Sequence, residues 1–148
     1  MKPLIVLVAV FLITALVLKL TNKLDWALAG RVAMAAMLCF TAIGHFAFAD
    51  GMAMMVPDVV PFKKEMVYAT GVLEVLFGIG LLVPSLRVYT AWALIAFLVL
   101  MLPANIKAAI ERVDYQNATY TGAGLGYLWF RVPLQVVFIV WTYLAGVR

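Results

Sequence analysis

The sequence predicts an all-α integral membrane protein with five transmembrane spans. Hydrophobic residues make up 67% of the 148 residues, charged residues only 12%, and the mean hydropathy is +1.09. A water-soluble domain of this length cannot cover its surface with so few charges. The apolar residues are concentrated in five stretches, each long enough to cross a bilayer as a helix. We therefore expect residues 1–148 to form a single integral membrane domain.

The five expected spans are residues 3–20, 30–49, 65–84, 88–110 and 128–147. Residues 50–64 are predicted to be a loop, because Gly51, Pro57 and Pro61 disfavour a continuous helix. Residues 114–127 are predicted to be a polar, glycine-rich connection. Pro103 lies near the far end of the fourth span, where it is expected to kink the helix and let Asn105 turn inward.

The first apolar stretch also has features of a signal peptide. Lys2 precedes it, and the Ala-Leu-Ala sequence at 27–29 resembles a cleavage site. However, the apolar run of about eighteen residues exceeds the usual length in a signal peptide, and Lys19 and Lys23 interrupt the approach to that site. We expect residues 3–20 to be retained as the first transmembrane helix.

The third span carries a carboxyl group at membrane depth. Gly71, Glu74 and Gly78 fall on one face of a helix. Glycines on this face allow a neighbouring helix to come close, so Glu74 is expected to face the interior of the bundle. A buried acid in a membrane is costly and by default indicates a functional site with a partner nearby. The alternative is a protonated structural glutamate that sets the helix register.

Polar side chains converge at one side of the membrane. The spans alternate in direction, so the end of the second and fourth and the start of the third and fifth lie on the same side. Those ends carry His45, Tyr68, Asn105 and Arg131. Glu74, about 15 Å along its helix, and Gln135 lie deeper. We expect a polar funnel entering a four-helix bundle, with Arg131 and Glu74 paired through Gln135 or water; alternatively, these groups only hold the helices together.

The sequence does not predict a metal or haem site. Met52, Met54 and Met55 could cover a pocket at the membrane interface or, with His45, hold Cu(I). Packing is the commoner use of methionine. Cys39 is the sole cysteine, which excludes an internal disulfide and a dithiol centre, and a single histidine excludes a bis-histidine haem.

The order of several short motifs resembles that of DoxX-like membrane proteins. These motifs are Gly44-His45-Phe46, a proline-containing loop, the G-x-x-E of 71–74 with trailing glycines, Pro84 with Arg87, and Pro103-Ala104-Asn105. The resemblance covers about residues 31–147, and residues 3–20 are additional to it. It implies a transmembrane four-helix bundle with one additional N-terminal transmembrane helix. Family members include a subunit of a thiosulfate:quinone oxidoreductase and a protein associated with a superoxide dismutase and a sulfurtransferase.

The resemblance and the funnel together suggest a redox-associated membrane protein that binds a quinone-like or other small amphipathic molecule. Glu74 and His45 would act catalytically by exchanging protons with its polar head. The ligand-binding residues would be Tyr68, Asn105, Arg131 and Gln135. Quinone is the candidate cofactor, and enzymatic activity stays open.

Two other classes of function remain as alternatives. One is a non-catalytic membrane scaffold that recruits membrane or peripheral redox proteins, and the other is a small-molecule transporter with Glu74 as a relay. Nucleic acid is not an expected partner, because the basic residues lie at segment ends, where they meet lipid headgroups.

The predicted location is the cell (inner) membrane, with the N-terminus and the funnel outside and Arg148 in the cytoplasm. Basic residues occur on both sides in similar number. The prediction therefore depends on the short basic connections at 19–31 and 84–87, which are typical of cytoplasmic turns.

Overall fold

The computed structural model describes residues 2–148, and this part of the chain is mainly helical. It contains no β-strand, only an isolated bridge between Asp114 and Thr119. Five helical segments are long and apolar enough to cross a membrane: Lys2–Leu20, Trp26–Ala47, Lys63–Leu82, Arg87–Ile110 and Gly124–Val147. The predicted all-α fold, a four-helix bundle with one additional N-terminal helix, is confirmed.

The helices follow one another through short connections. Their bounds are α1 (Lys2–Leu20), α2 (Trp26–Ala47), α3 (Ala49–Met55), α4 (Lys63–Leu82), α5 (Arg87–Leu100), α6 (Leu102–Ile110) and α7 (Leu128–Thr142), with a 3₁₀ turn η1 (Gly124–Tyr127) before α7 and a π-helical turn η2 (Tyr143–Val147) after it. The fourth span therefore consists of α5 and α6, and the fifth of η1, α7 and η2.

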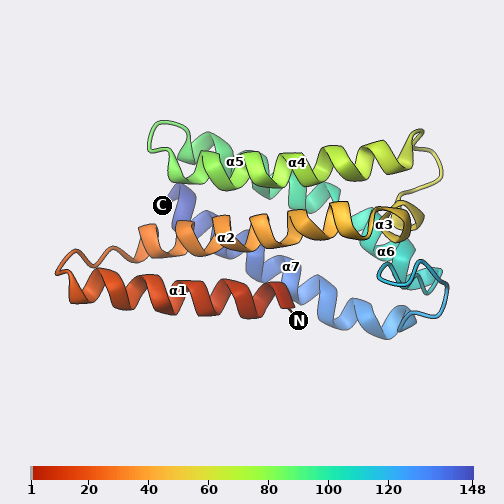
Figure 1. Cartoon of the computed structure of the whole chain (residues 1–148), viewed down its shortest axis with the longest axis horizontal. Coiled ribbons are helices and arrows are strands. Elements are labelled where there is room, and N and C mark those ends of the chain that lie inside the picture. Colours follow the sequence, from red (N-terminus) through yellow and green to blue (C-terminus); the bar gives the residue numbers. More distant parts are fainter. Residues whose placement is uncertain (1) are drawn as a thin grey trace.

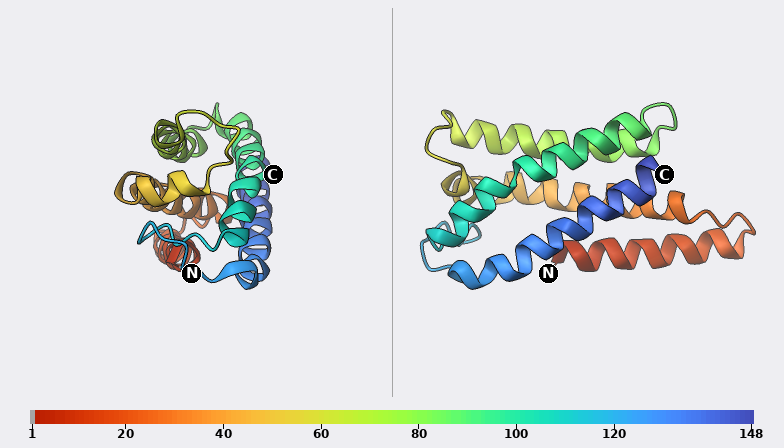
Figure 2. Two further views of the ribbon diagram at one scale, coloured as in Figure 1. Left: turned by 90° about the vertical axis from the view of Figure 1, so that its right-hand side faces the viewer. Right: turned by 180° about the vertical axis from the view of Figure 1, so that it is seen from behind.

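The helices form two layers. Figure 1 shows α1, α2 and α4 running side by side, with α3 and α6 gathered at one end of the molecule. Seen from that end, α4, α2 and α1 form one layer, and α5, α6 and α7 form the second (Figure 2). We call this end the α3–α6 end. It holds the end of α2, the start of α4 and the start of α7, as the alternation of the spans predicts.

Glycines bring α2 and α4 into close contact. A Cβ atom at Gly71 would lie 2.8 Å from the Cβ of His45, and one at Gly78 would lie 3.3 Å from the carbonyl oxygen of Ala35. Glu74 lies between these glycines and is only 9% exposed. The prediction that this face of the third span packs against a neighbouring helix, with Glu74 inside, is confirmed.

At the opposite end, side-chain hydrogen bonds to the backbone join α2 to the C-terminal end of the chain. Arg31 Nη1 donates to the carbonyl of Ala145 at 3.1 Å, and Trp141 Nε1 donates to the carbonyl of Gly30 at 3.0 Å. These bonds satisfy polar groups inside the helical bundle, where water is scarce.

The first helix packs against this core along one face. Leu7 is fully buried, and the ring of Phe11 lies edge-on to Trp141 with centroids 5.0 Å apart. Leu4, Val6 and Val10 are partly buried against the core. The opposite face of α1 carries exposed apolar side chains such as Leu12, as expected for a helix that faces lipid.

The second span begins earlier than predicted, at Trp26 instead of residue 30. The reason is a helix cap: the side chain of Asp25 accepts a hydrogen bond from the backbone N–H of Leu28 at 2.9 Å. The cleavage-like sequence at 27–29 therefore lies in the first turn of α2, where Ala29 is buried.

The prediction of a loop over residues 50–64 is wrong at its start, where Ala49–Met55 forms the helix α3. Gly51 does not break this helix. A Cβ atom at Gly51 would collide with the backbone of Tyr115, so glycine is needed there for close approach of another segment. Pro57 and Pro61 lie beyond the helix and only prevent its continuation.

Pro103 divides the fourth span in two, as expected. It lies in the first turn of α6, and α5 ends at Leu100 with Met101 between them. Because proline has no N–H, the regular hydrogen-bond pattern stops here. The carbonyl of Leu98 accepts a hydrogen bond from the side-chain amide of Gln135 on α7. This bond joins α5 to α7 within the second layer.

Candidate functional site

A cavity of about 600 Å³ lies between the helices toward the α3–α6 end. Five of the six predicted site residues line it: His45, Glu74, Asn105, Arg131 and Gln135. The rest of its wall is mainly apolar, and its volume is within the range of roughly 300–1,000 Å³ that is typical of ligand pockets. The predicted convergence of these polar groups into one cavity is confirmed.

Glu74 meets His45 across the close contact between α4 and α2. The His45 Nε2 and Glu74 Oε1 atoms are 3.5 Å apart, and both side chains are largely shielded from solvent. Gly71 makes this approach possible, because any larger residue would push the Cβ of His45 away. The two residues therefore form an acid–base pair from separate helices.

Hydrogen bonds on the far side of the imidazole orient this pair. His45 Nδ1 lies 3.1 Å from the carbonyl oxygen of Val67 and 3.0 Å from Thr70 Oγ1. The Thr70 hydroxyl itself donates to the same carbonyl at 2.8 Å. A carbonyl only accepts, so this geometry assigns the proton to Nδ1. His45 Nε2 then faces Glu74, and one proton between these two groups makes the pair electrically neutral whichever atom holds it.

Two buried polar atoms of the cavity residues lack hydrogen-bond partners within residues 2–148. They are Glu74 Oε2 and Arg131 Nε. Buried polar groups are nearly always satisfied, so such atoms in a cavity wall indicate places where a ligand or water binds. The cavity therefore offers an acid group and a cationic donor to its contents.

Arg131 and Glu74 do not contact each other directly. Of the two predicted bridges between them, the one through Gln135 is not formed, and the one through water stays a prediction. The carboxyl of Glu74 meets His45, and Arg131 instead lies over the ring of Tyr127, with Cζ 5.2 Å from the centroid. Gln135 does not bridge them, since its amide donates to Leu98 and its oxygen faces the amide of Asn105 at 3.5 Å. The reason is packing: Gly71 allows α4 to approach α2, so that Glu74 meets His45, and the position of α7 beside α5 brings the Gln135 amide to the carbonyl of Leu98.

The structure does not bring Tyr68 together with the other five predicted site residues. Tyr68 does not line the cavity, and its ring stacks on Phe46 with centroids 5.7 Å apart. Six residues along a helix turn the side chain by about 240°, so Tyr68 and Glu74 point in different directions. Thr70 precedes Glu74 by four residues, so it shares its face, and this spacing could have identified it.

The methionines of α3 divide between two surfaces. Met52 and Met55 line the cavity, whereas Met54 lines a separate pocket near the surface. The expectation that the cluster covers a pocket is therefore correct for two of the three. No group of three or more His, Cys, Asp or Glu residues capable of holding a metal occurs in the described chain.

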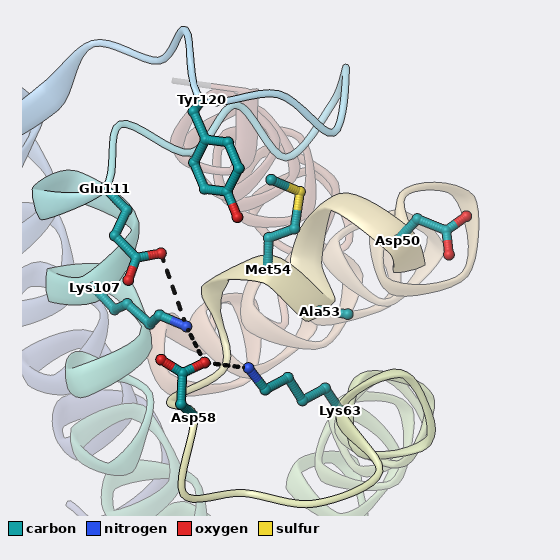
Figure 3. A pocket seen from close by; sticks show the side chains of 8 residues that line it. All are labelled: Asp50, Ala53, Met54, Asp58, Lys63, Lys107, Glu111 and Tyr120. Atoms are coloured by element: carbon teal, nitrogen blue, oxygen red, sulfur yellow. Dashed lines mark hydrogen bonds and ion pairs between the residues drawn. The ribbon is translucent and has the colours of Figure 1, made fainter.

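Ion pairs hold the segment that precedes α4 over the α3–α6 end (Figure 3). Lys63 and Lys107 both contact the carboxylate of Asp58, and Lys107 also donates to the carbonyl of Val56 at 3.0 Å. These hydrogen bonds to Lys63 and then to Lys107 lower the pKa of Asp58 to about 2. Because residues 56, 57 and 60 line the cavity, we call this arrangement the Asp58 clamp. Sequence reasoning missed it, since its members come from a loop and two helices.

Comparison with known proteins gives one match. A family model described as Domain of unknown function (DUF8561) matches residues 34–145, which include most of α2 and all of α3 to α7. No curated protein and no solved structure matches the chain. The matched region covers more than half of the 148 residues and contains all the polar residues that line the cavity. The chain belongs to the DUF8561 family, a domain of unknown function.

Proposed function

We propose that this protein binds a quinone-like or other small amphipathic molecule in the cavity and exchanges a proton with its polar head. The His45–Glu74 pair carries this proposal, because Glu74 Oε2 is unpartnered in the cavity wall while Oε1 faces an imidazole that is held in place. A hydroxyl of the ligand would give its proton to Oε2 of the Glu74 carboxylate, while the shared proton stays on His45 Nε2. The apolar wall suits a ring or chain that enters from the bilayer.

A redox role follows from the chemistry of such a ligand. Oxidation of a quinol would release two protons, one to the acid–base pair and one to water, and two electrons to an acceptor, which we propose to be a membrane or peripheral redox protein. The DoxX-like resemblance points the same way. Its support in the structure is local: Gly71 and Glu74 of the G-x-x-E motif lie against His45 of the Gly-His-Phe motif.

Quinone binding tests the proposal directly. The full chain in phosphatidylcholine nanodiscs is titrated with decylubiquinone, and the double variant His45→Leu/Glu74→Leu is compared with it. Replacing both members of a buried pair by apolar residues preserves folding better than removing one. We expect at least tenfold weaker binding by the double variant, on the order of the loss of one hydrogen bond to an ionisable group.

The matched control is Glu65→Gln, which changes an exposed acid on the same helix. It should bind decylubiquinone like the parent protein. Equal binding by the double variant and the parent would contradict the proposal, as would the absence of quinones and other amphiphiles from lipid extracts of the purified protein analysed by mass spectrometry.

We further propose that the protein lies in the cell (inner) membrane with its N-terminus and the α3–α6 end outside. The support is the pair of short basic connections at the opposite end, around 19–31 and 84–87. Single cysteines at the exposed positions Ser85 and Ala118, in a Cys39→Ser background, report the two ends. An impermeant thiol reagent on whole cells should label position 118 and not 85; the reverse pattern would invert the orientation.

A further inference from the structure

We propose that Arg131 is an anion-binding residue and that the preferred ligand of the cavity is a single-chain amphiphile whose polar head carries an oxyanion, such as a carboxylate or a phosphate. The inference rests on the proposed ligand-binding function and narrows the chemical class of the ligand. It depends on the charge balance of the cavity wall, on the free edge of one guanidinium group and on the apolar character of the remaining wall.

The charged edge of Arg131 is unoccupied by protein groups. Its guanidinium carbon lies over the ring of Tyr127, 5.2 Å from the centroid, and this cation–π contact supplies no oxygen acceptor for the N–H donors. The N–H donors lie in the plane and point outward. Within residues 2–148, Arg131 forms no ion pair with any carboxylate, and its buried Nε has no acceptor.

The cavity as a whole carries an unbalanced positive charge. Apart from Arg131, the titratable residues that line it are His45, Glu74 and Tyr115. His45 and Glu74 neutralise each other through their shared proton, and the Tyr115 phenol is neutral, because burial raises its pKa above the ordinary value. The carboxylate of Asp58 belongs to the clamp, where Lys63 and Lys107 occupy it. A partly buried cation without a partner is unfavourable, and an anion entering the cavity removes that cost.

The shape of the cavity selects the rest of the ligand. A volume of about 600 Å³ is much larger than a bare carboxylate or phosphate group requires. Its wall includes Leu134 and Phe138, which follow Arg131 along α7, and Phe97 of α5. An oxyanion at Arg131 would therefore be joined to an apolar tail that extends along α7 toward the bilayer centre. Planar oxyanions suit arginine, because its N–H groups match them in pairs.

Binding of radiolabelled decanoate to the full chain in phosphatidylcholine nanodiscs, at pH 8, tests the inference. The competitors separate head from tail: decyl phosphate keeps both, decanol lacks the charge, and inorganic phosphate lacks the tail. We expect decyl phosphate to compete with decanoate at least tenfold better than decanol does, and inorganic phosphate not to compete. Equal competition by decanol or by inorganic phosphate would overturn the proposal. If decanoate no longer binds in nanodiscs of the anionic lipid phosphatidylglycerol, the lipid itself occupies the anion site. That result would overturn the proposal that the ligand is a single-chain amphiphile.

Variants locate the anion site. Arg131→Gln should weaken decanoate binding about tenfold, the effect of losing a charge-assisted hydrogen bond, and leave decanol binding unchanged. Arg131→Lys keeps the charge and should fall between the two. Arg112→Gln removes the same charge from an exposed position that does not line the cavity. An equal loss in the Arg112 variant, or none in Arg131→Gln, would exclude Arg131 as the site; thermal melts confirm that each variant is folded.

The decylubiquinone titration separates this inference from the proposed function. If decanoate shows no preference over decanol but decylubiquinone still binds through His45 and Glu74, the anion site is wrong and the proposed function stands. If neither ligand binds the parent protein, both proposals are wrong.

Discussion

Glu74 is a carboxyl group held at membrane depth by one imidazole. Its Oε1 atom lies 3.5 Å from His45 Nε2, and its Oε2 atom has no partner in the described chain. An amide in place of this carboxyl can still form a hydrogen bond to the imidazole. A cation in the same position would be unpaired and close to Arg131, which lines the same cavity.

Substitutions of Glu74 test this arrangement. Glu74→Gln should fold like the parent protein, whereas Glu74→Lys should lose about 3–5 kcal/mol, the cost of breaking a buried pair. Fluorescence-detected size exclusion and thermal melts in detergent measure the difference. Glu65→Lys, on an exposed position of the same helix, is the control and should behave like the parent. Equal yields of Glu74→Lys and Glu65→Lys would show that Glu74 is not buried.

At the scale of helices, the contact between α2 and α4 depends on Gly71. We expect Gly71→Ala to destabilise the protein by roughly 1–3 kcal/mol, as overpacking does, because the added Cβ would lie 2.8 Å from that of His45. The matched control is Gly44→Ala on α2. Its Cβ would meet only Met52 Cε at an ordinary 3.5 Å, and alanine favours a helix, so this variant should be neutral or more stable. Thermal melts that rank the two variants in the opposite order would contradict the packing.

The Asp58 clamp should control the mobility of residues 56–62. Because the pKa of Asp58 is lowered to about 2, its stabilising contribution is present above the ordinary aspartate pKa of about 3.9 and is lost as the pH falls toward 2. At pH 7, Asp58→Asn should therefore speed hydrogen exchange in this segment several-fold. Asp50→Asn is the control, since Asp50 is equally exposed but pairs only with Lys64. Equal exchange of residues 56–62 in the two variants would argue against the clamp.

At the scale of the whole molecule, α1 is attached to the bundle chiefly through the face that carries Leu7. Leu7→Ala should lower the stability of the protein by roughly 2 kcal/mol, the low end of the range for a buried leucine. The low end applies because a helix that separates from the bundle is surrounded by lipid and not by water. Leu12→Ala changes a side chain that is 60% exposed and should have little effect. Thermal melts compare them, and intact mass shows whether residues 1–29 are present. Removal of these residues as a signal peptide would make both variants identical to the parent.

The sequence predicts the transmembrane spans and the orientation of several side chains. The five spans follow from the length of the apolar runs, because a helix must cross a hydrocarbon layer of fixed thickness and satisfies its own backbone hydrogen bonds. Because successive spans run in opposite directions, His45, Asn105 and Arg131 are expected on the same side of the membrane. The inward orientation of Glu74 follows from the glycines three residues before and four residues after it. All of these are properties of single helices and their order.

Only the tertiary structure determined which polar groups touch. Glu74 could have met His45 or Arg131, and the close approach of α4 to α2 at Gly71 decides for His45. Other contacts also join segments that are distant in sequence. Gly51 of α3 packs against the backbone of Tyr115, Gln135 bonds to Leu98, and the Asp58 clamp joins a loop to α6. Periodicity along a helix sets the face and depth of a side chain. Pairing requires atoms from two helices to come within a few ångströms, and that distance is set by the packing of the helices against each other.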